Sequence, residues 1–453
     1  MTTENYGPVM NRKLKRGSLL LFRVVGLLIV ATTTRVFPQQ WEYLGLPGEI
    51  ITAIAVQSRD TVYASTLGAI FKTTNGGATW DTLLPNTYVY VLDLKMHPAN
   101  PEVLYAALGN SSPPFGVLKT TNGGMTWFHA DSGIFVDWET SAQVIEFDPV
   151  SPETMYVGTA GFFGGNLYKS TNGGSSWTLL GVNDTSRLRE GVISITVNPT
   201  SINIIYAGTP QNGDLLKSTD GGVTWALTGL HDVSGVVDVK IDSIDTQLLY
   251  ACSGTIRRSS DGGVSWESIY SGLPSQSNSM SLAIDQITRK VYVGLYAISS
   301  DSGGVFQSND LGLSWQRTPG LFLTNNIRTI TLSPTYDQIY AGVNDSGIYR
   351  ANIVTGIDDR KNSTPLYTML MQNYPNPFNP TTTLDYELPK AADVTIKVFD
   401  VLGREVRVLV HDHKAAGRYS VIFDAQGLSS GVYFYRLTTS TGFTSIKKFV
   451  LIR

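Results

Sequence analysis

The sequence contains a single cysteine, Cys252, among its 453 residues. No intramolecular disulfide can form, so the fold has to be stabilised by packing, which a chain of this length can supply. Charged residues make up only 16% of the chain, and the formal net charge is −3. Proteins that bind nucleic acid usually carry an excess of basic residues, so this balance argues against a nucleic-acid partner.

Histidine is also scarce, and its spacing fits no metal site. The five histidines are His97, His129, His231, His411 and His413. We expect His411 and His413 to lie in a solvated polar loop. No glycine-rich phosphate loop leads from a strand into a helix. The sequence therefore predicts neither a metal nor another cofactor.

Long hydrophobic runs are absent except near the N-terminus. There, Lys13, Lys15 and Arg16 precede two short apolar runs at residues 19–22 and 24–31. A basic segment followed by a short apolar one is typical of an export signal, and the runs are too short to span a bilayer stably. We therefore predict a signal peptide over residues 1–40, cleaved within 31–40, and no transmembrane span in the mature protein. A membrane anchor is the alternative, and the start could be Met1 or Met10.

A nine-residue segment, called the box here, occurs six times. The first copy runs from Lys72 to Trp80 as KTTNGGATW, and consecutive box tryptophans are 41 to 50 residues apart. Repeats of about 40–50 residues are typical of β-propellers. The box tryptophans are Trp80, Trp127, Trp177, Trp225, Trp266 and Trp315.

Each box also carries an asparagine or aspartate five residues before its tryptophan. Such a side chain can accept hydrogen bonds from backbone N–H groups ahead of it, and the following glycine permits a positive φ. We therefore predict a structural turn and not a catalytic site. The residues are Asn75, Asn122, Asn172, Asp220, Asp261 and Asp310. We also expect the basic residue at the start of the repeat to be exposed: Lys72, Lys119, Lys169, Lys217, Arg258 and Arg350.

A second marker, a tyrosine followed by small residues, occurs seven times, once more than the box. The last repeat ends near Arg350 without a box, whereas a segment at Trp41 resembles the residues that follow the other boxes. The Trp41 segment should therefore supply the outer strand of the last blade and close the ring. We predict an all-β fold, with a seven-bladed β-propeller over residues 41–352.

These boxes resemble the Asp-box, or BNR, repeat, Ser/Thr-x-Asp/Asn-x-Gly-x-Ser/Thr-Trp. The resemblance implies a β-propeller. Related propellers include sialidases, xyloglucanase-type glycosidases, sortilin-type receptors and photosystem assembly factors. Because these families do unrelated things, the resemblance leaves function open.

The composition changes after the repeats, which predicts a linker over residues 353–372. Short alternating strands between turns then predict a small Ig-like β-sandwich of about seven strands over residues 373–453. Four segments in order resemble a type A C-terminal sorting domain of the type IX secretion system: YPNPFNP at 374–380, DVLGREV at 400–406, SGVYFYRL at 430–437 and the lysines at 447–448. The resemblance implies that residues 373–453 bind the translocon of a Bacteroidota-type bacterium. An ordinary accessory sandwich is the alternative.

One tryptophan, Trp138, belongs neither to a box nor to the ring closure. It lies in a long link between blades, and such links share one face of a propeller with the loops between second and third strands. We therefore expect aromatic side chains to gather on that face beside charged ones. The aromatic candidates are Phe115, Trp138, Phe162, Phe163 and Tyr296, and the charged ones are Asp137, Glu139, Arg187, Arg189 and Glu190. Exposed aromatics beside carboxylates suit a sugar or a peptide, although the same rings could simply pack on each other.

Arg257 is a further binding candidate, because its equivalents in other repeats are apolar. A glycosidase needs two carboxylates, and Asp137 or Glu139 could be among them together with a further carboxylate across the central cavity, but the Arg-Ile-Pro motif of sialidases is absent. We therefore favour a non-catalytic, monomeric binding protein, secreted or held at the outer-membrane surface, with a carbohydrate or protein ligand. The alternatives are a glycoside hydrolase or lyase, and an assembly factor like the photosystem propellers.

Overall fold

A computed structural model describes residues 41–84, 90–109, 116–136, 139–162, 164–181, 187–210, 212–231, 234–297, 302–319, 326–335, 337–353, 368–370, 373 and 376–452. The predicted signal peptide and most of the predicted linker lie outside these residues. The described residues form strands and turns, with no α-helix among them and one 3-10 turn, η1 (Arg187–Glu190). The predicted all-β class is confirmed.

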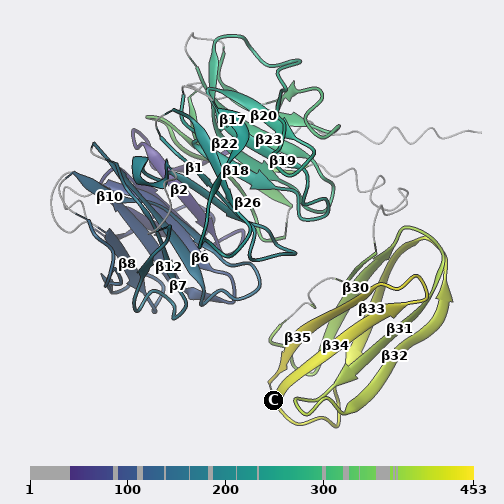
Figure 1. The fold of residues 1–453 in the computed structure, drawn as a ribbon. Helices are drawn as coiled ribbons and strands as arrows, with labels where there is room; N and C mark the ends of the chain where they lie inside the picture. Colours follow the sequence, from purple (N-terminus) through teal and green to yellow (C-terminus); the bar gives the residue numbers. More distant parts are fainter. Residues whose placement is uncertain are drawn as a thin grey trace, which may run out of the picture. The chain divides into compact units, whose positions relative to one another are not determined.

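Seven antiparallel sheets of four strands make up the described part of the repeat region (Figure 1). Sheet one is β2 (Ile51–Val56), β3 (Val62–Thr66), β4 (Ile70–Thr73) and β5 (Asp81–Leu84). Sheet two is β6 (Tyr90–His97), β7 (Asn100–Gly109), β8 (Gly116–Thr120) and β9 (Phe128–His129). Sheet three is β10 (Thr140–Phe147), β11 (Met155–Gly161), β12 (Leu167–Ser170) and β13 (Thr178–Leu179). Sheet four is β14 (Ser194–Val197), β15 (Ile205–Gly208), β16 (Asp214–Ser218) and β17 (Ala226–His231).

The remaining three sheets follow the same order along the chain. Sheet five is β18 (Asp238–Ile241), β19 (Leu249–Ser253), β20 (Thr255–Ser259) and β21 (Glu267–Ser268). Sheet six is β22 (Ser277–Ile284), β23 (Val291–Ala297), β24 (Gly304–Ser308) and β25 (Gln316–Arg317). Sheet seven is β26 (Ile327–Leu332), β27 (Gln338–Val343), β28 (Gly347–Asn352) and β1 (Trp41–Gly45). The N-terminal strand thus completes the sheet formed by the last three strands of the repeat region, with Trp41 opposite Ala351.

The sheets form a closed ring. The first strand of each sheet, called the inner strand here, contacts the inner strand of the next sheet, and β26 contacts β2 in turn. The buried apolar side chains fall into seven clusters, one at each junction between adjacent sheets. A sheet packed on both faces needs apolar residues on both, which explains why Val117 and Leu118 are both buried. We interpret the seven sheets as the seven predicted blades of a propeller.

Each box forms the same hydrogen-bonded turn between the third and fourth strands. In the first box, Asn75 Oδ1 accepts from the backbone N–H of Thr79 at 2.9 Å and from the Thr73 hydroxyl at 2.9 Å. The two equivalent bonds recur in the other five boxes. The residue after the Asn or Asp has a positive φ, and Leu311 holds this position in the sixth box at φ 61°.

The boxes also tie adjacent sheets together. In the preceding sheet, the buried Tyr206 donates its hydroxyl to Gly262 O of the fifth box at 2.9 Å, and the Lys217 ammonium donates to the same carbonyl at 2.8 Å. Lys72, Lys119 and Lys169 likewise donate to a glycine carbonyl of the next box. In the opposite direction, Trp177 Nε1 donates to Ala130 O of the preceding sheet at 2.7 Å.

The prediction that these basic side chains are exposed is wrong. The four lysines are half-buried because each lies over the ring of its own sheet's tyrosine, at 4.9 to 5.3 Å from the ring centroid. Arg350 is buried, since it bonds Glu42 of β1 at 2.6 Å and Arg59 O at 2.8 Å. Arg258 is half-buried and lies 3.5 Å from Glu267 on the neighbouring strand.

The C-terminal region forms two further sheets around one apolar core. One contains β29 (Met369–Leu370), β30 (Thr381–Leu388) and β33 (Gly417–Asp424). The other contains β31 (Ala392–Phe399), β32 (Glu405–Lys414), β34 (Gly431–Thr439) and β35 (Thr444–Leu451). β29 falls inside the predicted linker and pairs with β30. His411 and His413 are exposed but lie in β32, so their placement in a loop is wrong.

Candidate functional site

The strand order brings the predicted site segments to one end of the ring, called the loop face here. Because the sheets are antiparallel, the start of an inner strand lies opposite the end of the second strand, as Ile327 pairs with Val343. The links between sheets and the loops between second and third strands therefore share this end. Phe162 directly follows β11, and Tyr296 lies near the end of β23. The box turns lie at the opposite end.

At sheets three and four, the backbone holds several candidate residues together. Phe162 is 83% exposed, and its N–H donates to Glu139 O at 3.1 Å. Gly165 N–H donates to Arg189 O at 3.0 Å, so the loop after β11 is fixed between the two incoming links. Glu190 accepts from Asn212 Nδ2 at 3.0 Å in the corresponding loop of sheet four. These backbone bonds place the loop that carries the exposed Phe162 between the segments that carry Glu139 and Arg189.

At sheets six and seven, a second group surrounds Tyr296, which is half-buried. The neighbouring Ala297 N–H donates to Asn326 Oδ1 at 3.0 Å, and Asn344 N–H donates to Asn326 O at 2.8 Å. Asn326 therefore fixes the end of β23 against the end of β27. The Tyr296 phenol interacts electrostatically with the Arg328 guanidinium of β26. Arg328 was not among the candidates from the sequence.

The remaining candidates are Arg257 and five residues that the structure does not describe or describes only in their backbone. Arg257 lies in β20, and its Nη1 donates to Ser268 Oγ of the outer strand at 2.6 Å. Four candidates lie outside the described residues: Phe115, Asp137, Trp138 and Phe163. Arg187 begins η1, but its side chain is not described. The assignment of Asp137 or Glu139 as a catalytic carboxylate therefore stays a prediction.

Charged side chains on the inner strands were missed by the sequence analysis. Lys95 of β6 lies 3.2 Å from Glu146 of β10, and Lys240 lies 2.7 Å from Asp238 on β18. Burial opposes the charged form of Lys95, but Glu146 and Asp93 outweigh it and raise the pKa of the ammonium. The Asp-x-Lys pattern at 93–95 and again at 238–240 is a signal that could have indicated them.

Inner-strand groups also bond the next sheet directly. Asp93 Oδ2 accepts from Ile145 N–H at 2.9 Å, and Asp238 Oδ2 accepts from Leu282 N–H at 2.7 Å. Ser281 Oγ accepts from Ile330 N–H at 3.1 Å in the same position. These bonds stabilise the ring, so the presence of Asp93 and Asp238 on the inner strands is explained by a structural role.

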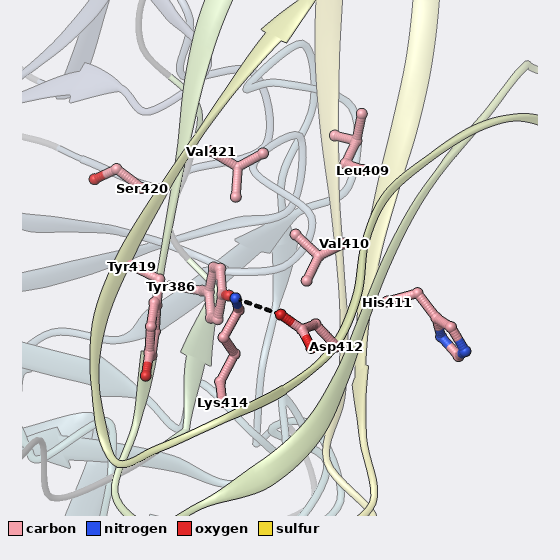
Figure 2. A pocket seen from close by; sticks show the side chains of 9 residues that line it. All are labelled: Tyr386, Leu409, Val410, His411, Asp412, Lys414, Tyr419, Ser420 and Val421. Carbon is pink, nitrogen blue, oxygen red and sulfur yellow. Dashed lines mark hydrogen bonds and ion pairs between the residues drawn. The ribbon is translucent and has the colours of Figure 1, made fainter.

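The C-terminal region contains a small pocket of about 250 Å³ beside β32 and β33 (Figure 2). The rings of Tyr386 and Tyr419 stack at a centroid distance of 5.1 Å, and Lys414 bonds Asp412 at 2.8 Å. Figure 2 shows the His411 side chain pointing away from this group. The Tyr419 hydroxyl donates to Ala415 O at 2.8 Å and the Ser420 hydroxyl donates to Asp385 Oδ1 at 2.5 Å, so these polar groups have partners within the C-terminal sheets.

Metal-binding clusters and membrane-spanning helices are both absent from the described residues. No group of three or more His, Cys, Asp or Glu side chains in that part of the chain is arranged to hold a metal ion. No helical segment there has the length and hydrophobicity that crossing a bilayer would require. Cys252 is buried, and burial raises the pKa of its thiol, as expected for a core residue.

Residues 372–452 match the family described as the secretion system C-terminal sorting domain. The match covers β30 to β35 and agrees with the resemblance found in the sequence. It indicates that the chain is handled by the type IX secretion system and exported to the cell surface or the extracellular space. No curated protein sequence matches the chain.

Solved structures similar to this chain are β-propellers. A GH74 xyloglucanase from Xanthomonas campestris has a TM-score of 0.55 at 16% identity, over 77% of this chain and 60% of its own. YCF48 bound to D1 peptide has a TM-score of 0.51 at 16% identity, over 71% and 97%. The extracellular domain of a putative hybrid two-component system from B. thetaiotaomicron has a TM-score of 0.51 at 13% identity, over 90% and 56%.

The chain thus spans 60% of the xyloglucanase and nearly all of YCF48. At 12 to 17% identity these similarities establish the propeller fold alone.

Proposed function

We propose that this chain is a non-catalytic binding protein, exported through the type IX secretion system, whose loop face takes a carbohydrate or a peptide. The observation that supports it most is Phe162, an aromatic side chain 83% exposed at the loop face, in a loop bonded to the segments of Glu139 and Arg189. An exposed aromatic ring beside charged groups is a typical ligand contact. The repeated lysines and tyrosines, in contrast, join adjacent sheets, so few of their polar atoms remain to bind a ligand.

Two of the similar structures fit this proposal. YCF48 is a propeller bound to a peptide, and the B. thetaiotaomicron propeller is the extracellular domain of a putative two-component system. The sorting domain at 372–452 supports a site of action outside the cell. We propose further that residues 373–453 bind the translocon and that the exported protein is a monomer. After export it is either attached to the surface or released.

A glycan-array screen of the purified full chain tests the proposal. We expect at least one glycan to bind, and Phe162→Ala and Trp138→Ala to weaken that binding. Phe128→Ala is the matched control, because Phe128 is 49% exposed on the outer strand of sheet two, after a box. Binding that is weakened equally by Phe128→Ala would contradict a site at the loop face. A peptide array decides between the two ligand classes if no glycan binds.

A glycoside hydrolase is the second candidate, since the similar structures include GH74 enzymes. It requires a pair of carboxylates across the bound sugar, and Glu139 or Asp137 is proposed as one of them. Incubation of any glycan that binds, followed by analysis of reducing ends, tests it. Hydrolysis abolished by Glu139→Gln would replace the non-catalytic proposal. An assembly factor similar to YCF48 is the third candidate, and it predicts a protein ligand and no glycan binding.

A further inference from the structure

The inner strands of the ring carry six Asp, Glu, Lys or Arg side chains. Five of them have partners: Lys95 with Glu146, Lys240 with Asp238, and Asp93 with two backbone N–H groups. The sixth, Arg328, has no hydrogen bond or ion pair within the part of the chain that the structure describes. A guanidinium without an anionic partner on this strand needs an explanation, because burying an unpaired charge costs free energy.

Arg328 occupies a special position in its strand. In β26 the register shifts between Ile327 and Thr329, so Arg328 is the extra residue of a β-bulge. Bulges redirect side chains and are over-represented beside functional sites. The same bulge recurs at the start of four other inner strands, where the extra residue is uncharged: Thr52, Leu92, Gln143 and Met280. Arg328 is therefore a charged departure from a repeated uncharged position.

The surroundings of Arg328 favour an anion. Its side chain is half-buried at the loop-face end of β26, and this burial lowers the pKa of the guanidinium. The Tyr296 phenol acts in the opposite direction, and no carboxylate among the residues that the structure describes contributes. Asn326 Oδ1 accepts a hydrogen bond from the N–H of Ala297, and this bond holds the segment that carries Tyr296. The backbone next to Tyr296 is thus held in place, and the Tyr296 phenol lies near a half-buried planar cation.

We propose that Arg328 and Tyr296 form a subsite for the carboxylate of an acidic oligosaccharide. The planar guanidinium can bind a carboxylate through two parallel hydrogen bonds, and the phenol can supply a third. The Tyr296 ring offers an apolar surface for the sugar that carries the carboxylate. This inference rests on the proposed binding function and specifies its ligand as a uronate-containing glycan.

Calorimetric titration of the full chain with trigalacturonate tests the subsite. We expect binding to the free acid and at least tenfold weaker binding, about 1.4 kcal/mol, to its methyl ester, in which the carboxylates are capped. Arg328→Gln should weaken binding of the free acid by a similar factor, and Arg328→Lys by less, because an ammonium cannot form the paired bonds. Arg317→Gln removes the same charge from the outer strand β25 of sheet six and should leave binding unchanged.

Three results would overturn the inference: equal binding of acid and ester, unchanged binding by Arg328→Gln, or Arg328-dependent binding of inorganic phosphate or a polyglutamate peptide without the uronate. If the free acid does not bind while neutral glycans bind through Phe162, the proposed function stays intact and only this subsite is rejected. A melting temperature of Arg328→Gln equal to that of the parent chain separates lost binding from lost folding.

Discussion

The two ends of the propeller differ in how far they repeat. At the box end, one turn recurs six times with the same hydrogen bonds, and the tyrosines and lysines of one sheet reach the box of the next. At the loop face, Phe162 and Arg328 have no equivalents of the same type. The repeated end accounts for the stability of the ring. The departures from the repeat are where a ligand would be recognised.

The box turns are of two kinds, which differ in the side chain that forms the turn. The boxes of sheets one to three use Asn, and those of sheets four to six use Asp. In the first box, Asn75 Nδ2 donates to Thr79 Oγ1 at 2.8 Å, whereas in the fourth, the Thr224 hydroxyl donates to Asp220 Oδ2 at 2.6 Å. In the Asn boxes the side-chain amide thus donates to the hydroxyl, whereas in the Asp boxes the hydroxyl donates to the carboxylate. Only the Asp boxes carry a charge.

The largest expected effect is a difference in the free energy of unfolding between a variant at the box end and a variant at the loop face. Trp177 of the third box is buried and bonds Ala130 O, so Trp177→Ala should lower the free energy of unfolding by about 3–5 kcal/mol. Phe162→Ala at the loop face should change it by less than about 0.5 kcal/mol, because the ring is exposed. Urea unfolding followed by tryptophan fluorescence and circular dichroism measures both. Equal losses would remove the distinction between the ends.

A smaller effect should follow from loss of a single contact between sheets. Tyr206→Phe removes the bond to Gly262 O and should cost about 1 kcal/mol of unfolding free energy. Tyr156→Phe is the matched control, because Tyr156 is equally buried but its hydroxyl has no hydrogen bond among the described residues. A cost that is the same for both variants would mean that the bond to the box contributes nothing.

The charged boxes should make the ring acid-sensitive in a defined direction. Hydrogen bonds from Thr224 and Ser265 lower the pKa values of Asp220 and Asp261 to about 2. Their contribution to stability is present above the unfolded pKa of about 3.9 and is lost as the pH falls towards 2. The triple change Asp220→Asn, Asp261→Asn and Asp310→Asn should therefore flatten the loss of stability between about pH 4 and pH 2.

Melting temperatures across this pH range measure the effect. Asn75→Asp is the reverse control and should steepen the loss, because it converts a neutral box into a charged one. An unchanged acid profile in the triple variant would place the acid sensitivity elsewhere in the molecule.

The smallest expected effect concerns Arg328. Since this side chain has no partner among the described residues, Arg328→Met should change the free energy of unfolding by less than about 0.5 kcal/mol. Urea unfolding without ligand measures it. A larger loss would mean that Arg328 stabilises the ring and is not held for a ligand.

The repeat allowed much of the fold to be predicted, because a periodic pattern indicates which strands pair within one sheet. The box spacing and the tyrosines predicted the sheets, and the surplus segment at Trp41 pointed to the strand that pairs with β28. The same pattern says little about contacts between sheets. Lys217 appears exposed within its own repeat, but it bonds the next box, and this pairing of residues 45 apart depends on how the sheets pack.

The loop face was harder to predict for a related reason. A search for unusual aromatic residues found Phe162 and Tyr296, because aromatic rings stand out in composition. Arg328 lies in a strand that otherwise fits the repeat, and its importance depends on a bulge and on missing partners. Neither property can be deduced from residue order, since both depend on the strand register and the neighbouring sheets.

The pairing of β1 with β28 has a consequence for synthesis and export. Trp41 lies opposite Ala351, so the first strand of the ring to leave the ribosome is the last to find its partner. A nascent chain must keep β1 unpaired while some 300 further residues are made, and contacts so distant in sequence form slowly. The sorting domain at 372–452 is translated only after every strand of the ring exists. When the sorting domain has been synthesised, every strand needed to close the ring has therefore been synthesised as well.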